Sequence, residues 1–170
     1  PLNGPATEPL PRYAAGIKRH LFEHIWIMAT IDGKLRPPLG VGNYHHPLAD
    51  SLDFFAINYY TRRLVQFVPD PRTLFGVERF SENAELSDSG QQGPYSEYHP
   101  AGLHQICEEV SVFDKPIYIT ENGLPDMADK HRAAFIMDHL RQIWQAISFC
   151  YPVMGYYHWS LVDNFEWNAG

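Results

Sequence analysis

The sequence is poor in the features that mark several classes of protein. Only two of its 170 residues are cysteines, Cys107 and Cys150, so no disulfide framework is expected. It has no Asn-x-Ser/Thr glycosylation sequence and no signal-peptide pattern, which favours an intracellular, reducing compartment such as the cytoplasm. No apolar run approaches the roughly 20 residues that span a membrane, so we expect a soluble protein with no membrane partner.

Positive charge is also scarce. Lys and Arg number 13 against 20 Asp and Glu, which gives a net charge of -7. A general nucleic-acid binder needs a basic surface, so this class is excluded. The sequence has no cluster of His, Cys and acidic residues at metal-ligand spacing and no glycine-rich phosphate loop. We therefore expect chemistry that needs neither a metal nor another cofactor.

The residues that are present indicate a folded α/β domain. Hydrophobic residues make up 45% and aromatic residues 14%, which is typical of a globular core. Hydrophobic periodicity alternates between the helical and the buried-strand pattern, and residues 69–100 form a long polar segment that is predicted as a loop. The predicted elements are a helix at 12–31, a strand at 52–60, a helix at 100–113, a strand at 115–120, a helix at 129–149 and a strand at 152–161. Such alternation predicts βαβ units and a parallel sheet.

Two parallel architectures fit this order. A doubly wound dinucleotide fold requires a glycine-rich turn after its first strand, but "INYYTRR" at 57–63 has no glycine. In a (β/α)8 TIM barrel, catalytic side chains stand at the carboxyl ends of the strands, and each predicted strand here ends in polar or aromatic groups. We therefore predict a TIM barrel, of which the chain supplies about three β/α units.

Three strands cannot close a barrel, which typically takes about 250 residues. The chain also begins "PLNGPATEP", without Met. We therefore expect residues 1–170 to be the carboxyl-terminal portion of a single barrel domain, with the remainder missing from the chain or supplied by a separate chain.

The groups predicted at the strand ends suit carbohydrate chemistry. Glu121 ends the second strand, and a carboxylate beside a phenol and an amide can attack an electrophilic carbon. Trp side chains can stack on the CH face of a sugar, and a further carboxylate can bind vicinal hydroxyls. In retaining glycosidases one carboxylate attacks the anomeric carbon and a second carboxyl group, about 5–5.5 Å away, protonates the leaving oxygen. The expected partner is a small glycoside or oligosaccharide.

Three sequence motifs make this interpretation more specific. "DFFAINYYT", "PIYITENG" and "GYYHWSLVDNFEW" resemble the late-strand signatures of the family-one glycoside hydrolases, the β-glucosidase family, and occur in the family's order. The similarity runs from about residue 50 to the end of the chain. It implies that the chain covers the sixth, seventh and eighth barrel strands.

The resemblance implies a role for individual residues. Glu121 would be the catalytic nucleophile, and Tyr60 would be the phenol that orients it. Tyr59 should point to the opposite face of its strand and is predicted as a core residue. The substrate-binding residues implied by the resemblance are Asn58, Trp159, Glu166 and Trp167.

The sequence departs from the family pattern in one important respect. The family's acid/base glutamate lies in an Asn-Glu-Pro motif, which does not occur here. Two hypotheses follow. The first is a retaining β-glycosidase of β-glucosidase type, which hydrolyses terminal non-reducing β-D-glycosyl residues through a glycosyl-enzyme on Glu121; the isolated chain should be inactive without the rest of the barrel. The alternative is a non-catalytic carbohydrate-binding or scaffold fragment.

Overall fold

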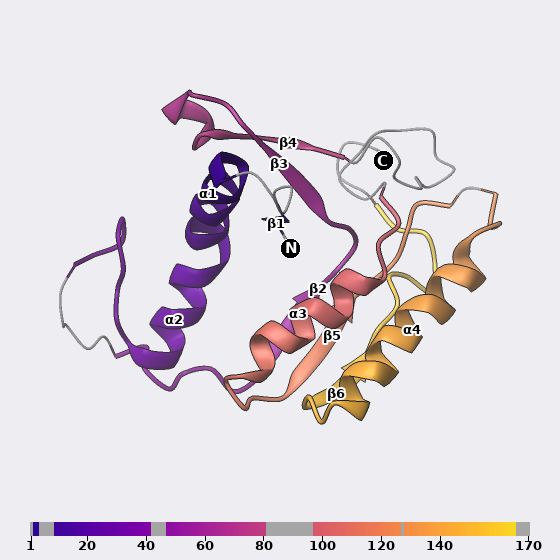
Figure 1. Cartoon of the computed structure of the whole chain (residues 1–170). Coiled ribbons are helices and arrows are strands. Elements are labelled where there is room, and N and C mark those ends of the chain that lie inside the picture. Colours follow the sequence, from indigo (N-terminus) through magenta and orange to yellow (C-terminus); the bar gives the residue numbers. More distant parts are fainter. Residues whose placement is uncertain (1, 4–8, 42–46, 81–96, 127, 166–170) are drawn as a thin grey trace.

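The structure is a computed structural model that describes residues 2–3, 9–41, 47–80, 97–126 and 128–165 (Figure 1). It contains two three-stranded sheets. One is parallel and consists of β2 (Phe55–Asn58), β5 (Ile117–Glu121) and β6 (Val153–Tyr156), in the order β2-β5-β6. The other consists of β1 (Leu2–Asn3), β3 (Arg63–Phe67) and β4 (Gly76–Arg79), in the order β1-β3-β4.

The parallel sheet confirms the predicted βαβ arrangement. Helix α3 (Ala101–Ser111) lies between β2 and β5 in the chain, and α4 (Arg132–Ser148) lies between β5 and β6. The two helices pack against each other beside the sheet (Figure 1). Because the strands are parallel, their carboxyl ends meet at one edge of the sheet.

The main core lies between this sheet and its two helices. Its fully buried members include Ile117 and Ile119 from β5 and Leu103 and Cys107 from α3. Burial raises the pKa of the Cys107 thiol to about 12, so this thiol is a protonated packing group. Tyr59 is also buried, which confirms its prediction as a core residue.

The hairpin β3–β4 was not predicted. Residues 69–100 were expected to be a loop, yet β4 lies within them and pairs antiparallel with β3. The strand pattern was not recognised because proline and glycine usually indicate a loop. Here Pro71 begins a short 3-10 helix, η2 (Pro71–Thr73), and Gly76 is the first residue of β4. Gly76 also allows close packing, because a Cβ there would lie 2.5 Å from the side chain of Val65.

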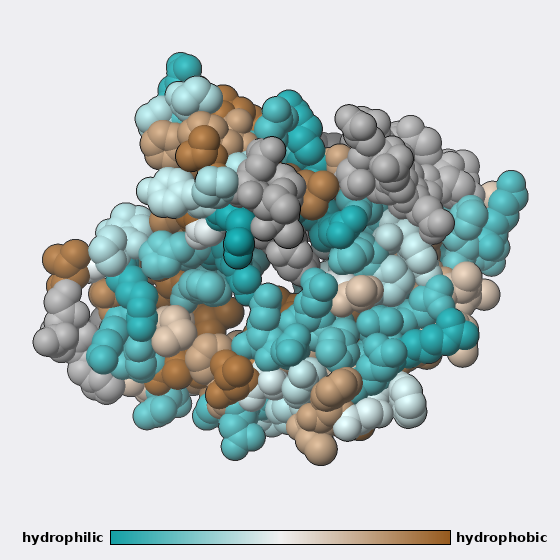
Figure 2. Space-filling view, viewed as in Figure 1, coloured by the Kyte–Doolittle hydropathy of each residue, from teal (hydrophilic) through white to brown (hydrophobic). Residues whose placement is uncertain are grey.

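The helix predicted at 12–31 forms as a continuous helical segment. It consists of α1 (Pro9–Arg19), a π-helical turn η1 (His20–His24) and α2 (Ile25–Asp32). It ends at Gly33, whose φ of 68° is left-handed and whose N–H donates to the carbonyl of Ala29. Several of its large apolar side chains remain exposed, and brown apolar surface gathers around α2 in Figure 2.

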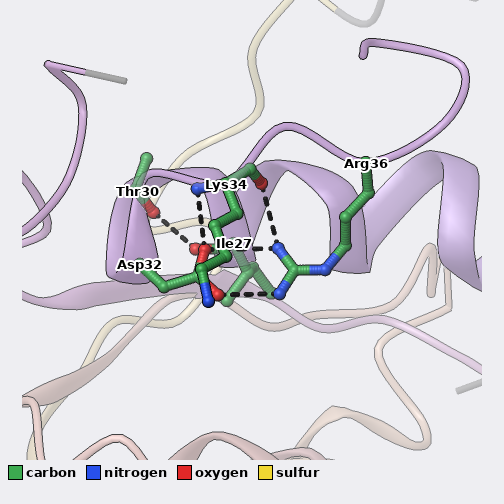
Figure 3. Close-up of polar contacts among 5 residues, drawn as sticks. All are labelled: Ile27, Thr30, Asp32, Lys34 and Arg36. Carbon is green, nitrogen blue, oxygen red and sulfur yellow. Dashed lines mark hydrogen bonds and ion pairs between the residues drawn. The ribbon is translucent and has the colours of Figure 1, made fainter. Parts of the chain in front are cut away.

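A local charge cluster secures the chain after α2 (Figure 3). The Asp32 carboxylate accepts hydrogen bonds from the Arg36 guanidinium, at 2.7 and 3.3 Å, and from the Lys34 N–H at 2.9 Å. The Arg36 bonds, with the Lys34 N–H second, lower the pKa of Asp32 to about 2. Solvent reaches this pair, so its contribution to stability is small.

Helix α4 is capped from a distance by Asp126. This buried carboxylate accepts backbone N–H groups from Lys130, His131 and Arg132 at 3.2, 2.8 and 2.8 Å. The first-turn N–H groups of a helix have no partner within the helix, and a carboxylate also suits its positive end. The cap therefore ties the segment that follows β5 to the start of α4.

His139 is fully buried in the inner face of α4. Its Nδ1 lies 2.8 Å from the carbonyl oxygen of Phe135, whose ring centroid is 3.9 Å from the imidazole. Burial is the main cause that lowers the pKa of His139 from 6.5 to about 4, and the nearby His99 and His158 act in the same direction. The Phe135 carbonyl and Asp138 oppose the shift.

We expect His139 to make the fold acid-sensitive. Below pH 6.5 His139 takes up a proton in the unfolded chain, whereas in the folded chain it stays neutral until about pH 4. The free energy of unfolding is therefore at its full value above pH 6.5 and falls as the pH is lowered. The loss should reach about 3 kcal/mol by pH 4. Urea unfolding at pH 7 and pH 4.5 measures it. His139→Leu, which has no proton to bind, should show a clearly smaller loss; an equal loss in both proteins contradicts the prediction.

Candidate active site

The strand ends of β2 and β5 bring Tyr60 and Glu121 together. The two strands run parallel, and their register places Asn58 opposite Glu121 after a shift at Ile57. The Tyr59 N–H donates to the Glu121 carbonyl at 2.9 Å, so the pairing continues past the end of β2. At this edge the Tyr60 hydroxyl donates to Glu121 Oε2 at 2.6 Å. A hydrogen bond to an ionised carboxylate is short and strong, and it fixes the orientation of the carboxyl group.

Asn58 lies at the same edge of the sheet. Its Oδ1 accepts a hydrogen bond from Thr120 Oγ1 at 2.7 Å, one residue before Glu121. Asn58 is exposed, and its backbone is paired in register with Glu121. The structure therefore groups three of the predicted site residues, Asn58, Tyr60 and Glu121, around the ends of two adjacent strands.

Trp159 approaches the site from the segment after β6. Its backbone N–H donates to the Asn122 carbonyl at 2.9 Å, so the segment is tied to the residue that follows Glu121. Trp159 is 41% exposed, so part of this large aromatic residue lies at the protein surface. Gly123 permits this approach, because a Cβ there would stand 1.9 Å from the Trp159 carbonyl oxygen.

Asn122 was not predicted as a site residue, since Asn-Gly after a strand usually marks a turn. It is 0% exposed, and its amide bridges the neighbouring strands. Nδ2 donates to the Tyr59 carbonyl at 2.7 Å, and Oδ1 accepts from the Tyr156 hydroxyl at 3.0 Å. Burial raises the pKa of Tyr156 to about 12, so this phenol remains a donor across the neutral range. No sequence signal distinguishes this Asn from an ordinary turn residue.

A salt bridge was expected for the arginines after β2, but its acidic partner was not predicted. Arg62 Nε donates to Glu97 Oε1 at 2.6 Å, and Thr61 Oγ1 donates to the Glu97 carbonyl at 2.8 Å. Glu97 is only 2% exposed although it lies in a segment predicted as a polar loop. The pair fastens the approach to α3 to the end of β2, next to Tyr60.

Two predicted residues, Glu166 and Trp167, lie outside the described residues. Within the described part of the chain, no group of three or more His, Cys, Asp or Glu side chains could hold a metal ion. No helix in that part is both long and apolar enough to cross a membrane. The described geometry thus presents a carboxylate oriented by a phenol, with the partly exposed Trp159 on a segment bonded to the residue after Glu121. A carboxylate held in this way is suited to attack on an electrophilic carbon.

Comparison with known proteins also indicates a glycosidase family. The family model described as glycosyl hydrolase family 1 matches residues 38–170. The β-galactosidase of Sulfolobus acidocaldarius is 34% identical over 137 residues, which cover 75% of this chain and 27% of that protein. β-Glucosidase A of Thermotoga maritima is 35% identical over 135 residues, which cover 72% of this chain and 28% of that protein. The chain thus spans about a quarter of the length of these relatives.

A solved structure extends the likeness to the fold. The β-glycosidase from Pyrococcus horikoshii superposes with a TM-score of 0.82 at 32% sequence identity, covering 100% of this chain and 39% of that one. The predicted fold class is confirmed, since the parallel sheet and its helices form part of a (β/α)8 barrel. With the family model matching most of its length, the chain belongs to glycosyl hydrolase family 1.

Proposed function

We propose that this chain carries the nucleophile side of the active site of a retaining β-glycosidase of β-glucosidase type. The observation that carries the proposal is the 2.6 Å hydrogen bond from the Tyr60 hydroxyl to Glu121 Oε2 at the carboxyl ends of adjacent parallel strands. Relatives that match the chain are named β-glucosidase, β-galactosidase and 1,4-β-D-glucan glucohydrolase. These names support a β-linked glycoside as substrate, with a terminal non-reducing residue as the part removed.

In the proposed reaction Glu121 is the nucleophile. Its carboxylate oxygen forms a bond to the anomeric carbon while the glycosidic C–O bond breaks and an acid gives a proton to the leaving oxygen. Water then attacks the same carbon, passes a proton to the conjugate base of that acid and releases Glu121. Tyr60 holds the carboxylate in line for the first step.

The other proposed residues bind the sugar. Trp159 offers a stacking surface for a sugar ring, and the Asn58 amide can hydrogen-bond a hydroxyl next to the reacting carbon. Glu166 and Trp167 are proposed, on the motif alone, to bind hydroxyls of the terminal sugar. Glucose and galactose differ only in the orientation of the hydroxyl at C4, so these contacts bear directly on which of the two sugars is bound.

The acid is proposed to come from outside this sequence. The chain has no Asn-Glu-Pro motif, and its described parallel sheet has three strands where a closed barrel has eight. We therefore propose that the remaining strands, and the acid/base carboxyl group on them, belong to residues outside this sequence or to another chain. The same observation favours the second candidate for the chain by itself, a non-catalytic carbohydrate-binding or scaffold fragment.

Covalent trapping tests the proposal. We suggest a chimera in which this chain replaces the segment that it matches in the Thermotoga maritima β-glucosidase A, so that a complete barrel surrounds Glu121. A 2-fluoro-β-glucoside with an activated leaving group needs no proton donor, and its fluorine slows release, so the glycosyl-enzyme accumulates. We expect peptide mass spectrometry to find the label on Glu121. A folded chimera that binds the sugar without labelling contradicts the glycosidase and supports the binding fragment.

A further inference from the structure

Asn122 follows Glu121 directly, yet its side chain is completely buried. A buried amide requires hydrogen-bond partners for both its ends, and here each partner belongs to a different flanking strand or strand end. We propose that Asn122 is a positioning residue, which sets the geometry of the Tyr60–Glu121 pair and the approach of Trp159. This inference rests on the proposed role of Glu121.

The link to Tyr60 runs through one peptide bond. Asn122 Nδ2 donates to the Tyr59 carbonyl at 2.7 Å, and this carbonyl belongs to the peptide unit that leads into Tyr60. Tyr59 is held at two further points, because its N–H donates to the Glu121 carbonyl at 2.9 Å and its hydroxyl donates to the His99 carbonyl at 2.6 Å. The bond from Asn122 therefore fixes the plane of the peptide from which the Tyr60 phenol extends.

The link to Trp159 runs on the other side of β5. The Asn122 carbonyl accepts the Trp159 N–H at 2.9 Å, while its Oδ1 accepts the Tyr156 hydroxyl at 3.0 Å. A primary amide supplies the donor that the carbonyl needs and the acceptor that the phenol needs. The side chain of Asn122 thus couples the end of β2 to β6, and its backbone carbonyl holds Trp159.

A spectroscopic measurement on the 170-residue chain tests this coupling directly. Tyrosine labelled with carbon-13 at Cζ reports the hydrogen bond of each phenol, and Tyr60→Phe identifies the Tyr60 signal. Glu121→Gln supplies the reference for an altered Tyr60 bond. In Asn122→Ala we expect the Tyr60 signal to move from its native position toward this reference. Alanine keeps the backbone carbonyl that accepts the Trp159 N–H but removes the Oδ1 that accepts the Tyr156 hydroxyl. The chain at and after β6 is then held less firmly, so hydrogen exchange of the Trp159 amide should quicken on the order of tenfold, as for the loss of one bond of about 1.4 kcal/mol.

Two further variants separate positioning from a general loss of stability. Val110→Ala removes buried volume on α3, away from the strand ends, and should leave the Tyr60 signal in its native position. Asn122→Asp restores the hydrogen-bonding pattern only when its carboxyl group is protonated, since an ionised carboxylate cannot donate to the Tyr59 carbonyl. Its Tyr60 signal should therefore return toward the native position as the pH falls.

The outcomes are distinct. The inference is overturned if Asn122→Ala folds and its Tyr60 and Trp159 signals are unchanged. It is also overturned if the Tyr60 signal moves as far in Val110→Ala as it does in Asn122→Ala. If Asn122→Ala fails to fold, Asn122→Asp decides, because a Tyr60 signal that does not follow pH overturns the inference equally. None of these readings requires turnover, so failed trapping on Glu121 with a shifted Tyr60 signal refutes the proposed function alone.

Discussion

Replacing Glu121 by alanine in the barrel chimera should lower the hydrolysis rate by a factor on the order of 10⁴ to 10⁶, the range found when single members of a catalytic triad are removed from a hydrolase. The loss arises because no other group in the described site is placed to form the bond to the anomeric carbon. Sodium azide should then restore turnover of a substrate with an activated leaving group. The small anion fits the space left by the carboxylate and attacks from the same side, so the product is an α-glycosyl azide.

The stereochemistry of that product is the decisive measurement. Proton NMR distinguishes the α-azide from a β-configured product, and the matched control is Glu108→Ala, which removes an exposed carboxylate from α3 and should leave the rate unchanged. A Glu121→Ala chimera that is folded and retains more than about a tenth of the parent rate would rule out Glu121 as nucleophile.

Gly123→Ala is expected to damage both the fold and the site. The added Cβ would lie 1.9 Å from the carbonyl oxygen of Trp159 and 3.0 Å from its carbonyl carbon, and both are backbone atoms that cannot rotate away. Either β5 or the segment that carries Trp159 must therefore move. Forced overpacking typically costs about 1–3 kcal/mol, and rigid neighbours place this case near 3 kcal/mol. Because Trp159 moves, sugar binding should weaken as well.

Gly16→Ala provides the matched control for that variant. Gly16 lies within α1, and a Cβ there would meet nothing within 4 Å. Alanine in a helix interior is favoured over glycine by about 0.5–1 kcal/mol, so this variant should be slightly more stable than the parent. Thermal unfolding of both variants, with titration of a β-glucoside, makes the comparison. Equal stability and equal affinity of Gly123→Ala and the parent would contradict the steric argument.

The parallel sheet could be predicted because its strands carry strong local signals. Runs such as that around Ile117 and Ile119 are short and apolar, as expected of strands covered on both faces. The hairpin β3–β4 could not be predicted, because its pairing depends on contacts with α1, such as the packing of Val65 with Ala14. Sequence periodicity does not encode such contacts. Strand propensity is a property of the surroundings as much as of the residues.

Some residues of the candidate site could likewise be predicted from the sequence, and others could not. Glu121 and Tyr60 were predicted from motifs, and the structure places them in hydrogen-bond contact, while their chemical roles remain proposals. Asn122 and Glu97 were missed because their importance lies in burial and in partners distant along the chain. Polar residues in turns are normally solvated, so only the structure distinguishes these two from ordinary surface residues.

The hydrogen bond between Tyr60 and Glu121 joins residues 61 positions apart in the sequence. Contacts of such long range form late in folding, because the entropy of closing the intervening chain must be overcome first. Glu121 therefore acquires its hydrogen bond from Tyr60 only once α3 has docked and β2 and β5 are aligned. The appearance of this hydrogen bond thus marks a late stage of refolding.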